Sequence, residues 1–243
     1  MKALVLCAGY ATRLYPLTLD RPKPLLPVGG KPLIAHITDR LAAVPEIDLI
    51  YIVTNEKFIG RFDSWHQDQR SRCEIRCLTD GTVSETDKLG AVCDLKFAIE
   101  QEHINDDLLV VAGDNLFGLD LNRLVDFYHA HGPSVAVCDV KDRELVKQYN
   151  EIRLDSGGRV VYFREKPAEP AATLTAICMY VFPPGIIGHI RQYSAEGNNL
   201  DQPGRFIEWL YKKIDLYGFV FIEPWFDIGD HKQYDRAQRE FNG

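Results

Sequence analysis

The sequence has no apolar run of the roughly 20 residues that a membrane-spanning helix needs. Its opening apolar stretch, KALVLC (2–7), is too short for the core of a signal peptide and leads to Arg13, not to a small-residue cleavage site. No set of Cys and His ligands for zinc is complete. The cysteines occur singly in mostly apolar segments: Cys7, Cys73, Cys77, Cys93, Cys138 and Cys178. We therefore expect reduced core thiols in a soluble, cytoplasmic protein.

Positive charge is also scarce. Lys and Arg number 28 against 35 Asp and Glu, a formal net charge of −7, which argues against a general binder of nucleic acid or anionic membranes. Residues 8–32, AGYATRLYPLTLDRPKPLLPVGGKP, are the exception. They hold a single acid, Asp20, and four cations: Arg13, Arg21, Lys23 and Lys31. A protein of this composition that binds an anionic small molecule needs local positive charge, and this segment supplies it.

The same segment follows directly on the apolar run 2–7. Gly9 is small enough to let the backbone approach a ligand, and N–H groups left free by a turn can bind phosphate oxygens. Arg13 and Lys23 would add a guanidinium fork and a point charge. A strand that leads into such a loop indicates a site for a nucleoside triphosphate.

Strand-like and helix-like segments alternate through the first half of the chain. The patterns predict strands over 2–7, 47–55, 74–78 and 107–115, and helices over 32–43, 56–70 and 89–102. This order, with fully apolar strands, predicts a parallel sheet covered by helices on both faces. Ligands of such sheets bind at the carboxyl ends of the strands. The loops after Cys7 and Leu78 and the turn at Asp114 should therefore lie along one edge.

The second half changes character. We predict strands over 134–140, 149–155, 159–166, 174–182 and 219–230, and helices over 204–213 and 230–241. The sequence contains no repeat, no low-complexity tract and no long linker. The fold class is therefore α/β, with one mixed domain over 1–243: a nucleotide-binding half, 1–118, and a more antiparallel half, 119–243, for a second substrate.

The motifs of the chain resemble those of a known family. AGYATRLYPLT followed by RPKPLLPVGGKP is similar to the signature of the sugar-phosphate nucleotidyltransferases, or nucleoside-diphosphate-sugar pyrophosphorylases, of the glucose-1-phosphate thymidylyltransferase type. Further landmarks of the family follow in order: LGA (89–91), VVAGDNLF (110–117), REKP (164–167) and WFDIG (225–229). The resemblance implies a Rossmann-like three-layer α/β/α sandwich. It also implies an enzyme that transfers a nucleotidyl group from a nucleoside triphosphate to a sugar 1-phosphate with Mg²⁺, and releases pyrophosphate.

The resemblance also implies roles for individual residues. Arg13, Lys23 and Asp114 would be catalytic, and Asp114 and Asp227 would hold the Mg²⁺, which prefers carboxylate oxygens. Nucleotide contacts would come from Arg13 and Lys23 together with Ala8, Gly9, Thr12 and Gly90. The second half would bind the sugar phosphate through Asn115, Tyr149, Glu165 and Lys166.

Several of these residues have a plain structural alternative. Arg13 and Lys23 would alone suit a solvated basic loop, and Glu165 with Lys166 an exposed pair. Asp114 could form a turn and Asp227 cap a helix, although Asp230 is the better capping candidate. Gly90 could serve close helix packing, and Tyr149 the core.

The chain departs from the family pattern at three positions that bear on substrate choice. Ala11 replaces the second glycine of the usual motif, and Asn150, which tolerates left-handed geometry, stands where glycine is common. Pro24 has no side-chain hydrogen-bonding group to read a base, and the loop 79–88 also differs from the expected base-reading segments. Our first choice is dTTP or UTP with glucose 1-phosphate. GTP with mannose 1-phosphate, or another nucleotide with a rarer acceptor such as a heptose phosphate, is the alternative.

Other protein classes fit less well. A nucleotide-sugar-binding regulator without catalysis should have lost at least one of five residues, all of which are present: Arg13, Lys23, Asp114, Lys166 and Asp227. A glycosyltransferase would hold its metal in an Asp-x-Asp turn, and a dehydrogenase would want small residues where 9–14 has Thr12 and Arg13. We expect no C-terminal regulatory site, no nucleic-acid or membrane partner, and a possible homo-oligomer.

Overall fold

The computed structural model describes residues 1–67 and 69–241, and a seven-stranded sheet of order β12-β8-β11-β6-β1-β4-β5 lies at its centre. Its strands are β1 (Lys2–Leu6), β4 (Leu49–Thr54), β5 (Glu74–Thr79), β6 (Leu108–Ala112), β8 (Ser134–Asp139), β11 (Leu174–Phe182) and β12 (Tyr217–Phe221). Neighbours run parallel, except that β11 is antiparallel to both β6 and β8. The predicted parallel sheet of the first half is thus confirmed.

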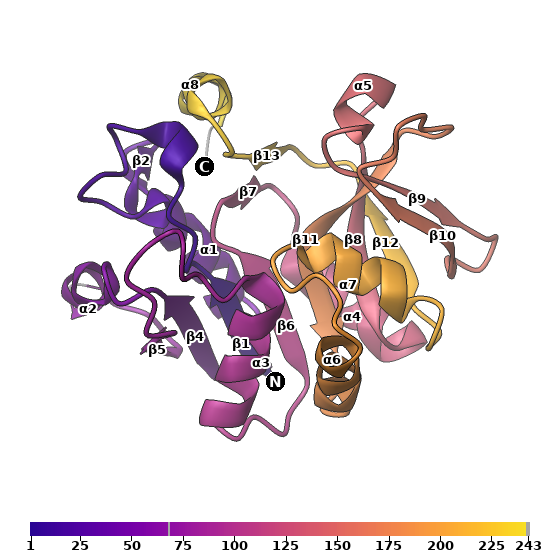
Figure 1. The fold of residues 1–243 in the computed structure, drawn as a ribbon, viewed down its shortest axis with the longest axis horizontal. Coiled ribbons are helices and arrows are strands. Elements are labelled where there is room, and N and C mark those ends of the chain that lie inside the picture. Colours follow the sequence, from indigo (N-terminus) through magenta and orange to yellow (C-terminus); the bar gives the residue numbers. More distant parts are fainter. Residues whose placement is uncertain (68, 242–243) are drawn as a thin grey trace.

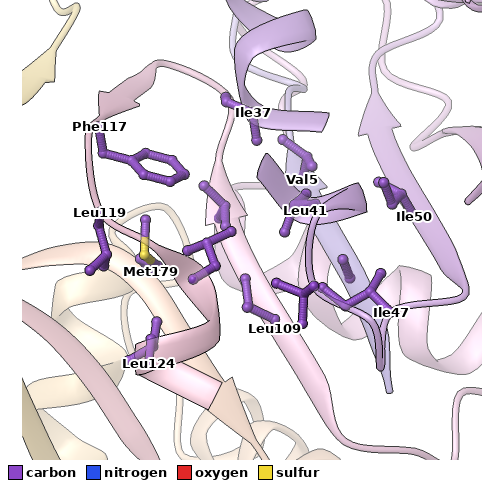
Figure 2. Close-up of a cluster of buried hydrophobic side chains, with 14 of the residues drawn as sticks. Val5, Ile37, Leu41, Ile47, Ile50, Leu109, Phe117, Leu119, Leu124 and Met179 are labelled. Carbon is purple, nitrogen blue, oxygen red and sulfur yellow. The ribbon is translucent and has the colours of Figure 1, made fainter. Parts of the chain in front are cut away.

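Helices cover both faces of this sheet, which gives the predicted three-layer α/β/α sandwich (Figure 1). One face packs against α1 (Leu33–Ala42), α2 (Ile59–Gln67) and α4 (Leu121–His131), and the other against α3 (Ala91–Gln101), α6 (Ile186–Ala195) and α7 (Pro203–Leu210). Because side chains alternate along a strand, Val5 of β1 belongs to the first core cluster and Leu4 to the second. Figure 2 shows part of the first cluster, where Val5 and Leu109 of the sheet lie among α1 residues such as Leu41.

The C-terminal segment of the chain packs against the loop 8–32 and forms a smaller unit with it. It contains the short helices η1 (Thr12–Leu14) and η2 (Lys23–Leu25), the pair β2 (Pro27–Val28) with β3 (Lys31–Pro32), and α8 (His231–Glu240). Leu14 and Leu26 of the loop are buried together with Phe226 and Tyr234. Tyr234 Oη also donates to the Pro27 carbonyl over 2.7 Å. The C-terminal segment of the chain is therefore packed against the loop that follows β1.

Some predicted elements are wrong in their limits. The single strand expected over 219–230 is two strands, β12 and β13 (Trp225–Asp227), because the chain passes Pro224, which has no N–H for a ladder, and moves from β8 to pair with β7 (Asn115–Phe117). The strand expected over 107–115 likewise divides into β6 and β7. Pro32 precedes α1 instead of opening it.

The remaining elements complete the second half. Strands β9 (Asn150–Leu154) and β10 (Val160–Glu165) form a separate antiparallel pair, as the more antiparallel pattern predicts. Helices α4, α6 and the short α5 (Arg143–Val146) occupy segments for which no helix was predicted.

Residue 68 of the helix expected over 56–70, and 242–243 of the domain expected over 1–243, lie outside the described residues. Within the described ranges, no helix is both long and apolar enough to cross a bilayer.

Candidate active site

A cavity of about 540 Å³ opens at the carboxyl edge of the parallel strands. The loop after Cys7, Asp80 after β5, and the turn at Asp114 all line it, which confirms the predicted convergence of these three segments. Eleven of the twelve predicted site residues line the cavity: Ala8, Gly9, Thr12, Arg13, Lys23, Gly90, Asp114, Asn115, Tyr149, Glu165 and Asp227. The fold therefore brings residues from both halves of the chain to one place.

Lys166 is the exception. Its side chain is exposed, its backbone has a left-handed φ of 47°, and its N–H donates to the Tyr149 carbonyl over 2.8 Å. It follows Glu165 at the end of β10. An exposed Glu–Lys pair was the structural alternative for these two residues, but only Lys166 is exposed and Glu165 is buried.

The centre of the cavity holds an ion pair between Lys23 and Asp114. Lys23 Nζ lies 2.7 Å from Asp114 Oδ2, across 91 positions of sequence. The other oxygen, Asp114 Oδ1, accepts from Asn115 Nδ2 over 3.0 Å. Asn115 is itself held by Trp225, whose Nε1 donates to Asn115 Oδ1 over 2.5 Å. Both oxygens of Asp114 are thus fixed by named donors.

Asp227 reaches the same place from β13. Strand β13 pairs with β7 so that Asp227 lies opposite Asn115, and the Ile228 N–H donates to the Asp114 carbonyl over 3.1 Å. Burial, followed by the negative charge of Asp114, raises the pKa of Asp227 to about 7. The alternative role of Asp227 as a helix cap is filled by Asp230, whose Oδ1 accepts from the Gln233 N–H at the start of α8. Two carboxylates, one of them paired with Lys23, therefore lie near each other in the cavity.

The loop after β1 has a shape that its sequence only partly indicates. Ala11 has a φ of 51°, in the left-handed region, and its carbonyl accepts from Thr18 Oγ1 over 2.8 Å. Asn55, which no motif of the sequence analysis singled out, anchors the loop by donating from its side-chain amide to the Ala8 carbonyl over 2.8 Å. Beyond Gly9, no described atom lies within 4 Å of where a Cβ would be, so this side of the loop stays open toward the cavity.

Gly90 has a packing requirement as well as a place in the cavity wall. Its φ is 92°, and a Cβ there would lie 2.6 Å from the Leu200 carbonyl oxygen. Gly90 therefore meets a close-packing requirement, against the backbone of 200–201 and not against a helix, while its contact with a nucleotide stays a prediction.

Three residues of the second half of the chain line another part of the cavity wall: Tyr149, Glu165 and Gly204. Glu165 is 8% exposed, and its Oε2 is a buried atom that has no hydrogen-bond partner among the described residues. Burial raises the pKa of Glu165 to about 7 although Lys166 and Arg205 lower it. A Cβ on Gly204 would overlap the Glu165 carboxylate, so the glycine is what leaves room for this carboxylate.

Two departures from the family motif have structural roles. The Asn150 side chain donates to the Ala176 carbonyl over 2.8 Å and accepts from the Ala176 N–H over 2.7 Å, joining β9 to β11. The idea that Asn150 serves a left-handed turn is wrong, because Asn150 is the first residue of strand β9 and is not among the described residues with a positive φ. Pro24 is buried beneath the Gly113 turn, where a Cβ on Gly113 would lie 3.2 Å from Pro24 Cγ.

Comparison with known proteins places these features in a family. Residues 2–242 match the family described as nucleotidyl transferase. The chain belongs to this family. The match includes the cation loop, Asp114 and Asp227, so the sequence resemblance and the geometry agree on the family.

The relatives match nearly the whole chain at modest identity. The chain is 30% identical over 244 residues to a putative mannose-1-phosphate guanyltransferase of Sulfolobus acidocaldarius, covering 99% of this chain and 63% of that protein. It is 28% identical to the UTP–glucose-1-phosphate uridylyltransferase AglF of Haloferax volcanii, covering 98% and 96%. A crystal structure of a putative glucose-1-phosphate thymidylyltransferase from Bacillus anthracis matches with a TM-score of 0.85 and 25% identity, covering 100% and 97%. The chain spans 51% to 63% of the length of the three curated relatives that it matches first.

Proposed function

We propose that this chain transfers a nucleotidyl group from a nucleoside triphosphate to a sugar 1-phosphate and releases pyrophosphate. The observation that carries the proposal is the Lys23–Asp114 ion pair beside Asp227, in one cavity with the buried Glu165. Cations for a triphosphate, two carboxylates for a metal and an unpartnered acceptor for a sugar hydroxyl are what this reaction requires. The relatives, named for uridylyl, guanylyl and thymidylyl transfer, support the same reaction class.

The reaction needs electrostatic stabilisation more than proton transfer. The attacking phosphate oxygen of the sugar phosphate is already an anion, and negative charge builds on the leaving pyrophosphate. Arg13 and Lys23 would neutralise that charge and hold the triphosphate in line with the attacking oxygen. The open loop at Gly9 leaves room for phosphate oxygens close to the backbone.

The residues also fit a magnesium ion. Asp114 and Asp227 offer hard oxygen ligands, and the pKa of Asp227 is raised by burial and by the negative charge of Asp114 despite the nearby Lys23 and Arg13, so a divalent cation would be favoured there. Bound Mg²⁺ would polarise the phosphoryl group and help to neutralise the pyrophosphate. No cluster of three or more Cys, His, Asp or Glu that could hold a metal occurs in 1–67 or 69–241, so substrate phosphates would complete the coordination.

The proposed site for the sugar, called the sugar end of the cavity below, consists of Glu165 and Tyr149. The free Oε2 of Glu165 would accept from a sugar hydroxyl, and Tyr149 is held beside it by the edge of Trp225, with ring centroids 5.2 Å apart. Lys166 would meet the sugar phosphate from the exposed side. These sugar contacts, the oligomeric state and the cytoplasmic location stay predictions.

A direct test is a matrix of ATP, CTP, GTP, UTP and dTTP against glucose, mannose and heptose 1-phosphates, scored by pyrophosphate release. We expect turnover for at least one pair, abolished by EDTA and restored by Mg²⁺. Binding of a nucleotide sugar without turnover of any pair would contradict the proposal and favour the regulator that lacks catalysis.

A further inference from the structure

A second acidic pair, separate from Asp114 and Asp227, lines the cavity. Asp80 follows β5, and Asp94 lies in the first turn of α3, after Gly90. Asp94 is only 5% exposed, and its Oδ1 has no hydrogen-bond partner among the described residues. A buried carboxyl oxygen that lacks a hydrogen-bond partner and lies in a cavity wall indicates a ligand-binding or other functional role.

Hydrogen bonds fix the orientation of Asp80. The Thr82 N–H and hydroxyl both donate to Asp80 Oδ1 over 2.8 Å, and the Tyr10 hydroxyl donates to Thr82 Oγ1 over 3.2 Å. This leaves Asp80 Oδ2 for other partners. Burial, then the charge of Asp80 and a hydrogen bond with it, raise the pKa of Asp94 to about 8. Burial raises the pKa of Asp80 as well, but Asp94 is the more deeply buried of the two and is the member that holds the proton, which leaves Asp80 as the hydrogen-bond acceptor.

The sheet order places Asp80 toward the edge of the sheet that is away from β11 and β9, and Asp94 of α3 adjoins it. Strand β5 is at one edge, the loops after β1 and β6 carry the phosphate-binding groups in the middle, and β11 with β9 lies beyond them. A nucleotide with its phosphates at Arg13 and Lys23 and its acceptor at Glu165 thus has its base near Asp80 and Asp94. The nearby cation Lys88 is already paired with Glu85 at 2.9 Å and Asp201 at 3.4 Å, so this end keeps an excess of acid.

We propose that Asp80, positioned by Asp94, selects a base that carries an exocyclic amine, and so favours guanine, cytosine or adenine over uracil and thymine. An ionised carboxylate accepts hydrogen bonds and donates none, and an amino group supplies the N–H that it needs. Uracil and thymine present one N–H between two carbonyl oxygens, which would face the carboxylate. The inference rests on the proposed function for the placement of the phosphates, and it departs from the choice of dTTP or UTP made from the motifs.

Equilibrium binding tests the base preference without requiring turnover. Calorimetric titration of the full chain with GTP, CTP, ATP, UTP and dTTP, in the presence of Mg²⁺, should show at least one amino-bearing triphosphate binding about tenfold tighter than UTP or dTTP. Asp80→Asn should lower that ratio at least about fivefold, because an amide also donates and can pair with a uracil carbonyl. Asp94→Asn should keep the ratio within about twofold, since its amide can donate to Asp80 as the protonated acid does.

Tighter binding of UTP or dTTP than of all three amino-bearing triphosphates would overturn the inference, and so would an unchanged ratio in folded Asp80→Asn. Pyrophosphate release, measured on the same samples, separates the two claims. A base preference without any pyrophosphate release would contradict the proposed function and leave the base selection standing.

Discussion

At the scale of single residues, the loop 8–32 after β1 contains a strained position. Ala11 adopts a φ of 51°, where a residue with a Cβ is disfavoured by about 1 kcal/mol or more. Ala11→Gly should relieve this strain and leave the free energy of unfolding unchanged or raised by up to about 1 kcal/mol, after the entropy of glycine is subtracted. Urea denaturation measures the difference.

Ala43 provides the matched control, because it is exposed and has an ordinary φ of −75° at the end of α1. Ala43→Gly should lower the free energy of unfolding by about 0.5–1 kcal/mol. Equal losses at both positions would show that Ala11 carries no strain.

Asp94 should make stability depend on pH. Its pKa is raised from 3.8 to about 8 by burial and by Asp80, so the folded state holds a proton that the unfolded chain releases above pH 4. Stability from this group is complete below about pH 4 and is lost as the pH rises through about 8. Asp94→Asn should therefore be more stable than the wild type by about 1–3 kcal/mol at pH 8, with almost no difference at pH 4. A pH-independent difference in urea denaturation would contradict this.

The residues that the sequence identified and those it missed differ in a physical way. Lys23, Asp114 and Asp227 lie in contiguous motifs, and the resemblance of those motifs to the family signature singled them out. Asp80 and Asp94 form one unit only after β5 and α3 fold against the same cavity, and neither local pattern reveals the other partner.

At the scale of elements, the start of α7 shapes the sugar end. Gly204 leaves room for the Glu165 carboxylate, which a Cβ would overlap. Gly204→Ala should displace Glu165 and raise the KM for the sugar 1-phosphate at least about fivefold, with less effect on the KM for the triphosphate, because the sugar end is separate from Arg13 and Lys23. Steady-state kinetics with each substrate varied in turn gives both constants.

Gly188, inside α6, is the control for a new methyl group in a helix. A Cβ there would meet no described atom within 4 Å, and no positive φ opposes it. Gly188→Ala should leave both KM values unchanged and stabilise the fold by about 0.5–1 kcal/mol. A parallel rise of both KM values in Gly204→Ala would contradict a specific role at the sugar end.

Element prediction succeeded where periodicity was strong and failed where tertiary contacts decide. The apolar strands of the first half are buried on both sides, so their runs are continuous and easy to recognise. The break between β12 and β13 depends on the pairing of Trp225 with Phe117, 108 positions away, which no local pattern contains.

At the scale of the whole molecule, the two halves share one sheet. Strand β6 of the first half pairs with β11 of the second, and β7 pairs with β13. Thermal or urea unfolding should therefore be a single cooperative transition. Trp65 lies in the first half, and Trp209 and Trp225 in the second, so tryptophan fluorescence and far-UV circular dichroism should give coincident curves. Two separate transitions would contradict the single mixed domain.

We expect the Lys23–Asp114 pair to serve nucleotidyl transfer rather than stability. Lys31 provides a matched comparison: it lies in the same segment and also pairs with an aspartate, Asp39, at 2.5 Å, but lines no part of the cavity. The decisive measurement is Mg²⁺-dependent pyrophosphate release by the purified Lys23→Ala and Lys31→Ala variants, each shown to be folded. We predict a loss of at least about 100-fold in Lys23→Ala and less than about twofold in Lys31→Ala. Near-normal turnover in Lys23→Ala would contradict the account.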